Sequence, residues 1–205
     1  MSYLRKPFLS ISFIFGLYLF AGSTQASVGW IFENEQLTGA TGVEISGSLY
    51  NVSFIDDSCI NAFDGCDSVD DFTFKTQDDA LVAANALLDQ VLLDANSSML
   101  LLDSDPETTF GCVQLFTCVI IIPHATDVAA NSMSGIFTTN RAANFSVDEA
   151  VPGGGLFRDQ NTETNGETFV YAKFTSAQPV PVPAAAWLFG SALLGFAGIS
   201  KRKRT

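Results

Sequence analysis

The sequence predicts an α+β domain between residues 27 and 178, with a small, mainly antiparallel sheet and one main packed helix. An N-terminal signal peptide and a C-terminal transmembrane helix are expected to flank it. Two observations predict this class: several short segments have the two-residue alternation of strands, and residues 77–93 have apolar positions at helical spacing. About 150 residues suffice for one domain with its own core.

The first elements read as strands and turns. Residues 30–32 are expected to form a strand and residues 39–42, which contain two glycines, a turn. Residues 43–45 and 49–54 then form a hairpin around Ser46 and Gly47. The side chains of the second hairpin strand that share one face, at period two, are Tyr50, Val52 and Phe54.

Thr76 and Asp79 resemble a capping box, so a helix is expected to begin after Thr76 and to run to about Leu93. Acidic residues in its first turn suit the positive end of the helix dipole. The positions that should form its buried stripe, at spacings of three and four, are Leu81, Ala84, Leu88 and Val91 or Leu92.

The second half of the domain is predicted to be mostly β. Residues 113–122, 134–139 and 168–175 are expected to be strands, the last of which leads into a proline-rich linker. The glycine run at residues 152–155 predicts a flexible break. Between the first hairpin and the helix, residues 59–71 form an acidic loop bounded at its start by a cysteine.

Residues 1–26 have the three parts of a secretory signal. Arg5 and Lys6 supply the positive charge, residues 8–20 are apolar, and small residues precede an expected cleavage site before Ser27. An uncleaved N-terminal anchor is the alternative. The small residues directly after a short apolar stretch favour cleavage by signal peptidase.

Residues 179–205 form a second targeting segment. A proline motif at 180–183 is followed by an apolar stretch at 184–200 and a basic tail at 201–204. A helix of about 17 residues rises about 25 Å, which spans a thin hydrocarbon core. Because cations resist translocation, the tail should remain in the cytoplasm and the domain outside the inner membrane. A plain anchor and a GPI signal are the alternatives; the latter normally ends in apolar residues.

The order of these parts resembles the PEP-CTERM sorting signal of Gram-negative bacteria that make extracellular polysaccharide. The resemblance implies recognition and cleavage near the proline motif by an exosortase, a membrane transpeptidase. Val182 departs from the family pattern, which has a glutamate between the prolines. Ser191 and Gly195 also form a small face that could pack on another membrane helix. The residues that carry the resemblance are Val180, Pro181, Val182, Pro183, Trp187, Gly190, Ser191, Gly195, Lys201, Arg202, Lys203 and Arg204.

Charge is divided sharply along the chain. Of ten cations, only Lys75, Arg141, Arg158 and Lys173 lie in the exported part, which also holds all 22 acidic residues and so has a net charge of −18. Such a surface repels nucleic acid and favours divalent or cationic partners. Nucleic-acid binding is therefore not expected.

Four cysteines lie in the exported part, and an even count in an oxidising compartment predicts disulfides. Three pairings are possible, of which the local one, Cys59–Cys66 with Cys112–Cys118, closes two short loops and is favoured. A metal site is the alternative, but neither pair has the two-residue spacing of zinc motifs.

Catalytic chemistry has few candidates. His124 is the only histidine, and a triad would have to use it, although no Gly-x-Ser-x-Gly motif accompanies it; a structural or loop histidine is the simpler interpretation. Paired carboxylates could hydrolyse polysaccharide, but carboxylates are too numerous to select a pair. We expect no enzyme activity and no required cofactor.

Calcium is a candidate ligand of the acidic loop, because hard cations need several oxygens. The alternative is a solvated acidic surface, and the EF-hand register does not fit. The carboxylates concerned are Asp56, Asp57, Asp64, Asp67, Asp70 and Asp71.

Taken together, these features predict an exported bacterial protein. It should be anchored in the inner membrane with its domain on the periplasmic side, and processing of the C-terminal segment would then release it to the cell surface or matrix. The expected role is a structural or interaction module with extracellular polysaccharide as a candidate partner. A secreted enzyme acting on that polymer and a calcium-binding matrix protein are the alternatives.

Overall fold

The computed structural model describes residues 27–94, 101–142, 145–162 and 169–177. The predicted signal peptide and the C-terminal segment 179–205, with all its sorting residues, lie outside these ranges. Within them, no helix is long and apolar enough to cross a membrane. The strands are β1 (Gly29–Glu33), β2 (Gln36–Ile45), β3 (Ser48–Ile55), β4 (Thr117–Asp127), β5 (Ser132–Arg141), β6 (Glu149–Phe157) and β7 (Phe169–Ser176). The helices are α1 (Cys59–Ala62), α2 (Gln77–Gln90) and the 3₁₀ turns η1 (Val69–Asp71) and η2 (Pro106–Thr108).

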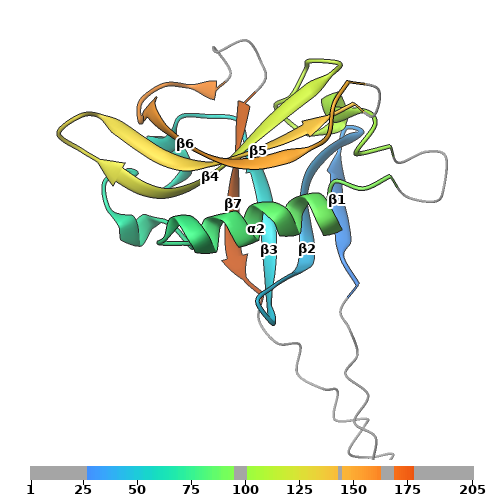
Figure 1. Cartoon of the computed structure of the whole chain (residues 1–205), viewed down its shortest axis with the longest axis horizontal. Helices are drawn as coiled ribbons and strands as arrows, with labels where there is room; N and C mark the ends of the chain where they lie inside the picture. The colour runs from blue at the N-terminus through green and yellow to red at the C-terminus, as the bar shows by residue number, and fades with distance from the viewer. Residues whose placement is uncertain (1–26, 95–100, 143–144, 163–168, 178–205) are drawn as a thin grey trace, which may run out of the picture.

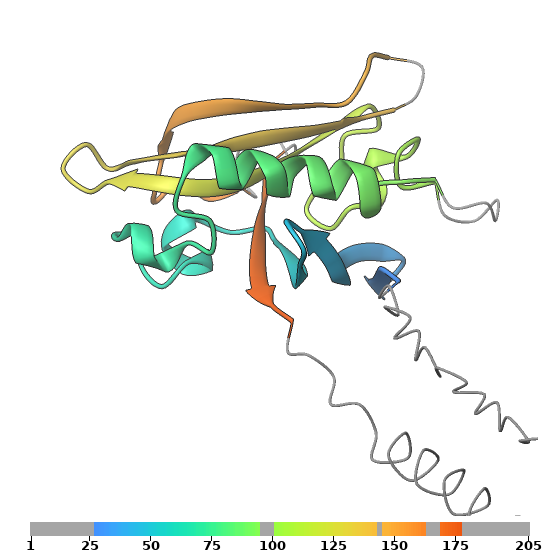
Figure 2. The ribbon, with the colours of Figure 1, turned by 60° about the horizontal axis from the view of Figure 1, so that its bottom comes forward.

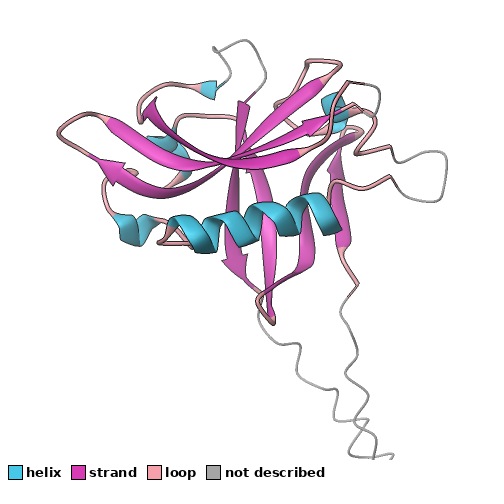
Figure 3. Ribbon diagram, viewed as in Figure 1, coloured by secondary structure: helices cyan, strands magenta, loops and turns pink. Residues whose placement is uncertain are grey.

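The strands form a seven-stranded sheet in the order β1-β2-β3-β7-β4-β5-β6 (Figure 1). Every neighbouring pair is antiparallel except β4 and β7, which run parallel from Val119–Phe169 to Ile121–Tyr171. The last strand thus inserts between the first three strands and the later three, which joins both halves of the chain. The predicted sheet-dominated α+β class is confirmed (Figure 3).

α2 packs against β2 on one side and against β4, β5 and β6 on the other, so the twisted sheet curves around it (Figure 2). The Thr76 hydroxyl accepts a hydrogen bond from the Asp79 amide, as the predicted N-cap requires. At the other end the Gln90 side chain bonds both backbone groups of Glu44, at 2.9 and 2.8 Å. The helix ends at Gln90, three residues before the predicted end at Leu93.

The predicted buried stripe is confirmed at Ala84 and, just beyond the helix, at Val91 and Leu92. Ala80, Ala83 and Leu87 are also fully buried, whereas the predicted Leu81 and Leu88 are half-buried at the edge of the core. The small alanine side chains let the helix backbone approach the sheet closely, and Leu81 and Leu88 pack against the edge of the core. Helical periodicity alone does not choose between these two adjacent faces.

Both faces of the central strands are covered. Val170, Ala172 and Phe174 of β7 belong to the larger core beneath α2, whereas Tyr171 between them belongs to a smaller core on the opposite face. The predicted core positions Val52 and Phe54 lie in the larger core, with half-buried Tyr50 packed against it. The smaller core is closed by the loop that carries Cys59 and Cys66.

Two predicted breaks are strands instead. Residues 39–42 lie inside β2, and the preceding turn is formed by Asn34 and Glu35, both at positive φ. Gly39 is needed because a Cβ there would lie 2.3 Å from the Val52 carbonyl oxygen on β3.

Residues 152–155 likewise lie inside the edge strand β6 rather than in a flexible break. A Cβ on Gly153 would come within 2.7 Å of the Phe137 ring, so the glycine makes room for a neighbouring aromatic side chain. The strand predicted at 113–122 is shifted: β4 begins at Thr117 and continues to Asp127.

Candidate functional site

The cysteines form the two predicted local disulfides, Cys59–Cys66 and Cys112–Cys118, and all four are buried. The first joins Cys59, at the start of α1, to Cys66 further along the acidic loop, over the smaller core. The second closes the loop before β4. With no free cysteine in the chain, neither pair is in a form that could act as a thiol nucleophile or a thiolate ligand.

The Cys59–Cys66 loop is seated on the sheet by aromatic packing. Phe63, in the middle of the loop, contacts Phe72 and Tyr171 edge-on, with ring centroids 5.5 and 5.7 Å apart. Ser58 caps the short helix α1 by accepting from the Asn61 amide. The loop is therefore packed on the sheet through its apolar side chains, whereas Asp64, Asp67 and Asp70 of the acidic loop are exposed to solvent.

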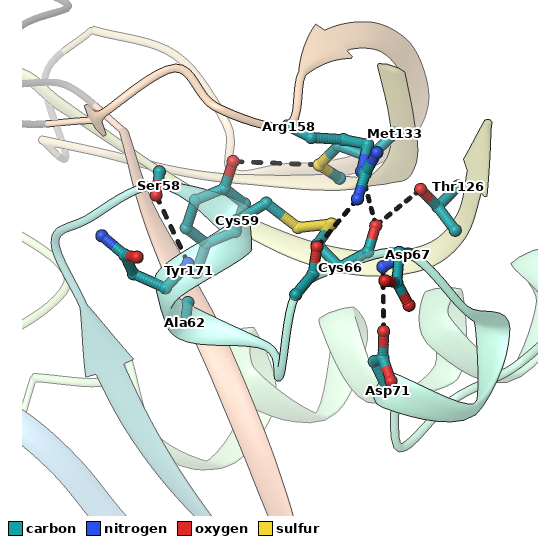
Figure 4. Close-up of a disulfide and its surroundings, with 12 residues drawn as sticks. Ser58, Cys59, Ala62, Cys66, Asp67, Asp71, Thr126, Met133, Arg158 and Tyr171 are labelled. Atoms are coloured by element: carbon teal, nitrogen blue, oxygen red, sulfur yellow. Dashed lines mark hydrogen bonds between the residues drawn. A yellow bond between two sulfur atoms is a disulfide. The ribbon is translucent and has the colours of Figure 1, made fainter. Parts of the chain in front are cut away.

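Arg158 fixes the end of this loop (Figure 4). It is only 7 % exposed, its Nε donates to the Cys66 carbonyl at 2.6 Å, and its Nη2 donates to the Gly65 carbonyl at 2.8 Å. The Thr126 hydroxyl donates to the same Cys66 carbonyl at 2.8 Å. A buried guanidinium thus ties the chain that follows β6 to the disulfide loop.

Further hydrogen bonds join residues 158–162 to residues 56–60, on either side of Cys59. The Arg158 carbonyl accepts from the Ile60 amide at 3.2 Å, and the Thr162 amide donates to the Asp57 carbonyl at 3.3 Å. The Thr162 hydroxyl lies 2.7 Å from Asp56 Oδ1. Residues 158–162 are consequently held at both ends by hydrogen bonds to the chain around Cys59 and Cys66.

A cavity of about 220 Å³ lies between this segment and the sheet. Its lining is mainly aromatic and aliphatic, with one amide and one hydroxyl side chain. The lining residues are Ile121, Leu156, Phe157, Gln160, Thr162, Phe169 and Tyr171. None of these side chains carries a charge at neutral pH.

Four of the six aspartates of the predicted calcium site bind different partners: Asp56 accepts from Thr162, Asp57 from Ser58 and Asn61, Asp70 pairs with Lys75, and Asp71 caps η1. Asp71 accepts from the amides of Asp67 and Ser68, closing the capping box of η1 (Figure 4). Among the described residues, no three histidine, cysteine or acidic side chains are grouped so that they could hold a metal ion.

Two of these carboxyls have lowered pKa values. Hydrogen bonds from the Asn61 side chain and the Ser58 amide lower the pKa of Asp57, and the ammonium of Lys75 lowers that of Asp70. Each carboxylate is thus stabilised by a partner no more than five residues away in the sequence.

His124 lies in β4, next to a register shift between Pro123 and Ala125, and not in a loop. It is half-buried, and burial lowers its pKa because the charged imidazolium is disfavoured there. Within the described part of the chain, no hydrogen bond joins its ring to a serine or a carboxylate. The geometry supplies no triad around it.

Asp148 and Asp103 form a carboxyl pair that the sequence did not predict. Asp148 accepts from the Arg141 amide at 2.7 Å and shares a hydrogen bond with Asp103 from the loop before η2. Burial, chiefly, and the Asp103 carboxylate raise the pKa of Asp148 to about 6. The two residues lie 45 positions apart in the sequence, so no local sequence pattern indicates that their carboxyls meet.

Each of the four cations between residues 27 and 178 has an internal partner. Lys75 pairs with Asp70, Arg141 pairs with Glu149, and Lys173 donates to the Ala62 carbonyl. Arg158 makes the two carbonyl bonds of the loop clamp. The exposed charge of the domain is therefore dominated by carboxylates.

Comparisons with protein-family models, with curated proteins and with solved structures found no match to this chain.

Proposed function

We propose that this chain is an exported bacterial surface or extracellular-matrix protein whose folded domain acts as an interaction module. In this proposal signal peptidase removes residues 1–26, and the segment 184–200 holds the chain in the inner membrane. An exosortase then cuts near Pro181 and Pro183. Extracellular polysaccharide is the candidate partner of the domain.

The observation that carries this proposal is that all four cysteines are joined in two buried disulfides. Structural disulfides persist in oxidising compartments and are rare in the cytosol. Both ends of the chain have the composition of export and anchoring signals, and the domain between them has a net charge of −18. Such a charge favours solubility outside the cell and disfavours contact with anionic lipid.

The topology also supports an outward-facing module. β7 ends at Ser176 beside Tyr50 of β3, and the Ala177 amide bonds the Leu49 carbonyl near the β2–β3 turn. A tether that follows β7 therefore leaves from this side of the domain (Figure 1). The cavity lies at the opposite end of β7, at Phe169, roughly 20 Å away at about 3.3 Å per residue.

Mass spectrometry of the protein from a Gram-negative host that contains an exosortase tests this proposal. We expect an N-terminus at Ser27, two disulfides and a C-terminus near the proline motif. A matched variant in which Lys201, Arg202, Lys203 and Arg204 are changed to serine should be mislocalised or unprocessed. A full-length, reduced protein in the cytosolic fraction would overturn the proposal.

A further inference from the structure

The cavity beside the Cys59–Cys66 loop has the features of a binding site for an uncharged ligand. We propose that it binds one ring of a neutral sugar, presented as a unit of a longer chain. This inference deepens the proposed function and depends on it only for where the ligand is encountered.

The cavity is preformed. One wall consists of Ile121 and Tyr171, which are paired neighbours on the parallel strands β4 and β7. Tyr171 is 2 % exposed and packs edge-on against Phe63 of the disulfide loop. The facing wall is the segment after β6, which Arg158 and Thr162 attach to the same loop. A ligand would therefore meet walls already in place, which reduces the ordering cost of binding.

The lining chemistry selects the class of ligand. Phe157, at the rim and 55 % exposed, and Phe169 supply aromatic rings, whose faces are electron-rich. The weakly positive C–H face of a pyranose packs well on such a face. Gln160 and Thr162 are the polar residues of this lining; the Thr162 hydroxyl already donates to Asp56 and to the Asp57 carbonyl, so it can offer a sugar hydroxyl only its oxygen, as an acceptor.

Electrostatics argues against charged ligands. Among the described lining residues there is no cation to pair with a uronate, phosphate or sulfate group, and the four cations of the domain have partners elsewhere. The surrounding negative charge would further repel an anion. The same described lining holds no carboxylate for an ammonium group, and the nearby Asp56 already accepts from the Thr162 hydroxyl.

Size and position suit one unit of a polymer. At about 220 Å³ the cavity is smaller than the roughly 300–1,000 Å³ of pockets that enclose drug-sized ligands. It is open on one side, so a chain could continue beyond the bound ring. Its distance from the tethered end of β7 leaves that opening accessible when the domain is anchored.

Ligand-observed NMR with the full-length, disulfide-bonded protein in detergent tests the inference. The probes are glucose, galactose, mannose and N-acetylglucosamine, with glucuronate as the anionic comparison and benzyl alcohol as the apolar one. We expect saturable binding of at least one neutral sugar, with a Kd of the order of 1 mM, and at least tenfold weaker binding of glucuronate.

Two exposed phenylalanines give a matched pair of variants. Phe157→Ala should weaken sugar binding at least tenfold, whereas Phe32→Ala, on the edge strand β1 that β2 and β3 separate from β7 and 37 % exposed, should change it less than twofold. Gln160→Ala, which removes an amide and no ring, should also weaken binding and serves as the second test should Phe157→Ala not fold. Melting temperatures confirm that each variant is folded.

Binding of benzyl alcohol alone, failure of all four sugars to bind, or sugar binding unchanged in both Phe157→Ala and Gln160→Ala would overturn the inference. These results would leave the proposed function intact if the exported protein still carries both disulfides and its processed ends. Conversely, sugar binding by a protein found in the cytosol would sink the proposed function alone.

Discussion

Replacing Arg158 by alanine tests whether the buried guanidinium holds the disulfide loop in place. The substitution removes two hydrogen bonds from a charged donor, to the carbonyls of Cys66 and Gly65. Such bonds contribute about 1.5–3 kcal/mol each. Two effects reduce the total: Thr126 still donates to the Cys66 carbonyl, and a buried charge no longer has to be desolvated. We therefore expect a net loss of about 2–3 kcal/mol in the free energy of unfolding.

Urea unfolding with both disulfides intact measures this loss, provided that the m-value stays constant. Lys75→Ala is the matched control, because Lys75 pairs with Asp70 at the surface, where their side chains are 53 % and 76 % exposed. Exposed ion pairs of this kind contribute little to stability. The expected order is therefore a clearly larger loss for Arg158→Ala than for Lys75→Ala.

A loss below about 0.5 kcal/mol for Arg158→Ala, or one equal to that of the control, would refute this reasoning. It would mean that the loop is held by the disulfide and by Phe63 alone. Amide hydrogen exchange at Ile60, whose N–H bonds the Arg158 carbonyl, would then be unchanged as well. The stated mechanism instead requires faster exchange there in the variant.

Three further predictions concern other parts of the domain. Asp148→Asn should flatten the pH dependence of stability. The folded pKa of about 6 lies above the ordinary aspartate value of 3.8, so the contribution of the protonated carboxyl is complete below about pH 4 and is lost as pH rises through 6. The full shift corresponds to about 3 kcal/mol, which partial exposure reduces to about 1–2, and melting temperatures from pH 4.5 to 7.5 measure it; identical profiles for both proteins would contradict it. Gly153→Ala should lower stability by about 1–3 kcal/mol, because the new methyl group meets the Phe137 ring at 2.7 Å. Gly154→Ala is the milder control, since the nearest atom to its new methyl group is the Ser134 hydroxyl oxygen at 3.0 Å. Equal melting temperatures for the two variants would count against the clash. Thr76→Ala should cost about 1 kcal/mol through the lost cap of α2, measured by urea unfolding, whereas Thr76→Ser should retain most of it.

Features fixed by neighbouring residues could be predicted from the sequence. The β2–β3 turn needs positive φ at Ser46 and Gly47, and the alternation that follows marks the strand. Thr76 signals the start of α2 because its cap bond reaches only three residues along the chain. The cysteine pairs were predictable for the same reason, since separations of seven and six residues bring their Cα atoms to 5.6 Å.

Features that depend on distant partners could not be predicted. The glycines of β2 and β6 read as turns, yet Gly39 and Gly153 are there because Val52 and Phe137 lie against them from neighbouring strands. The cavity likewise draws its walls from β4, β6 and β7, and Arg158 reaches a carbonyl 92 residues away. Arg158 was visible only as one of four cations in an acidic domain, which marks it as unusual but does not locate its partner.

That scarcity of cations links the stability of the domain to what it can bind. Arg158 keeps its positive charge when buried, but its guanidinium is directed at the carbonyls of Cys66 and Gly65, so it makes the loop rigid and is not available to pair with an anionic ligand. Long-range attraction then cannot bring an anionic polymer to the cavity, and salt screening would weaken the repulsion without creating a pairing group. Recognition at this end of the domain must therefore come from short-range packing on Phe157 and Phe169 and from hydrogen bonds to uncharged groups. The arrangement that stabilises the disulfide loop is thus the same one that restricts the cavity to neutral partners.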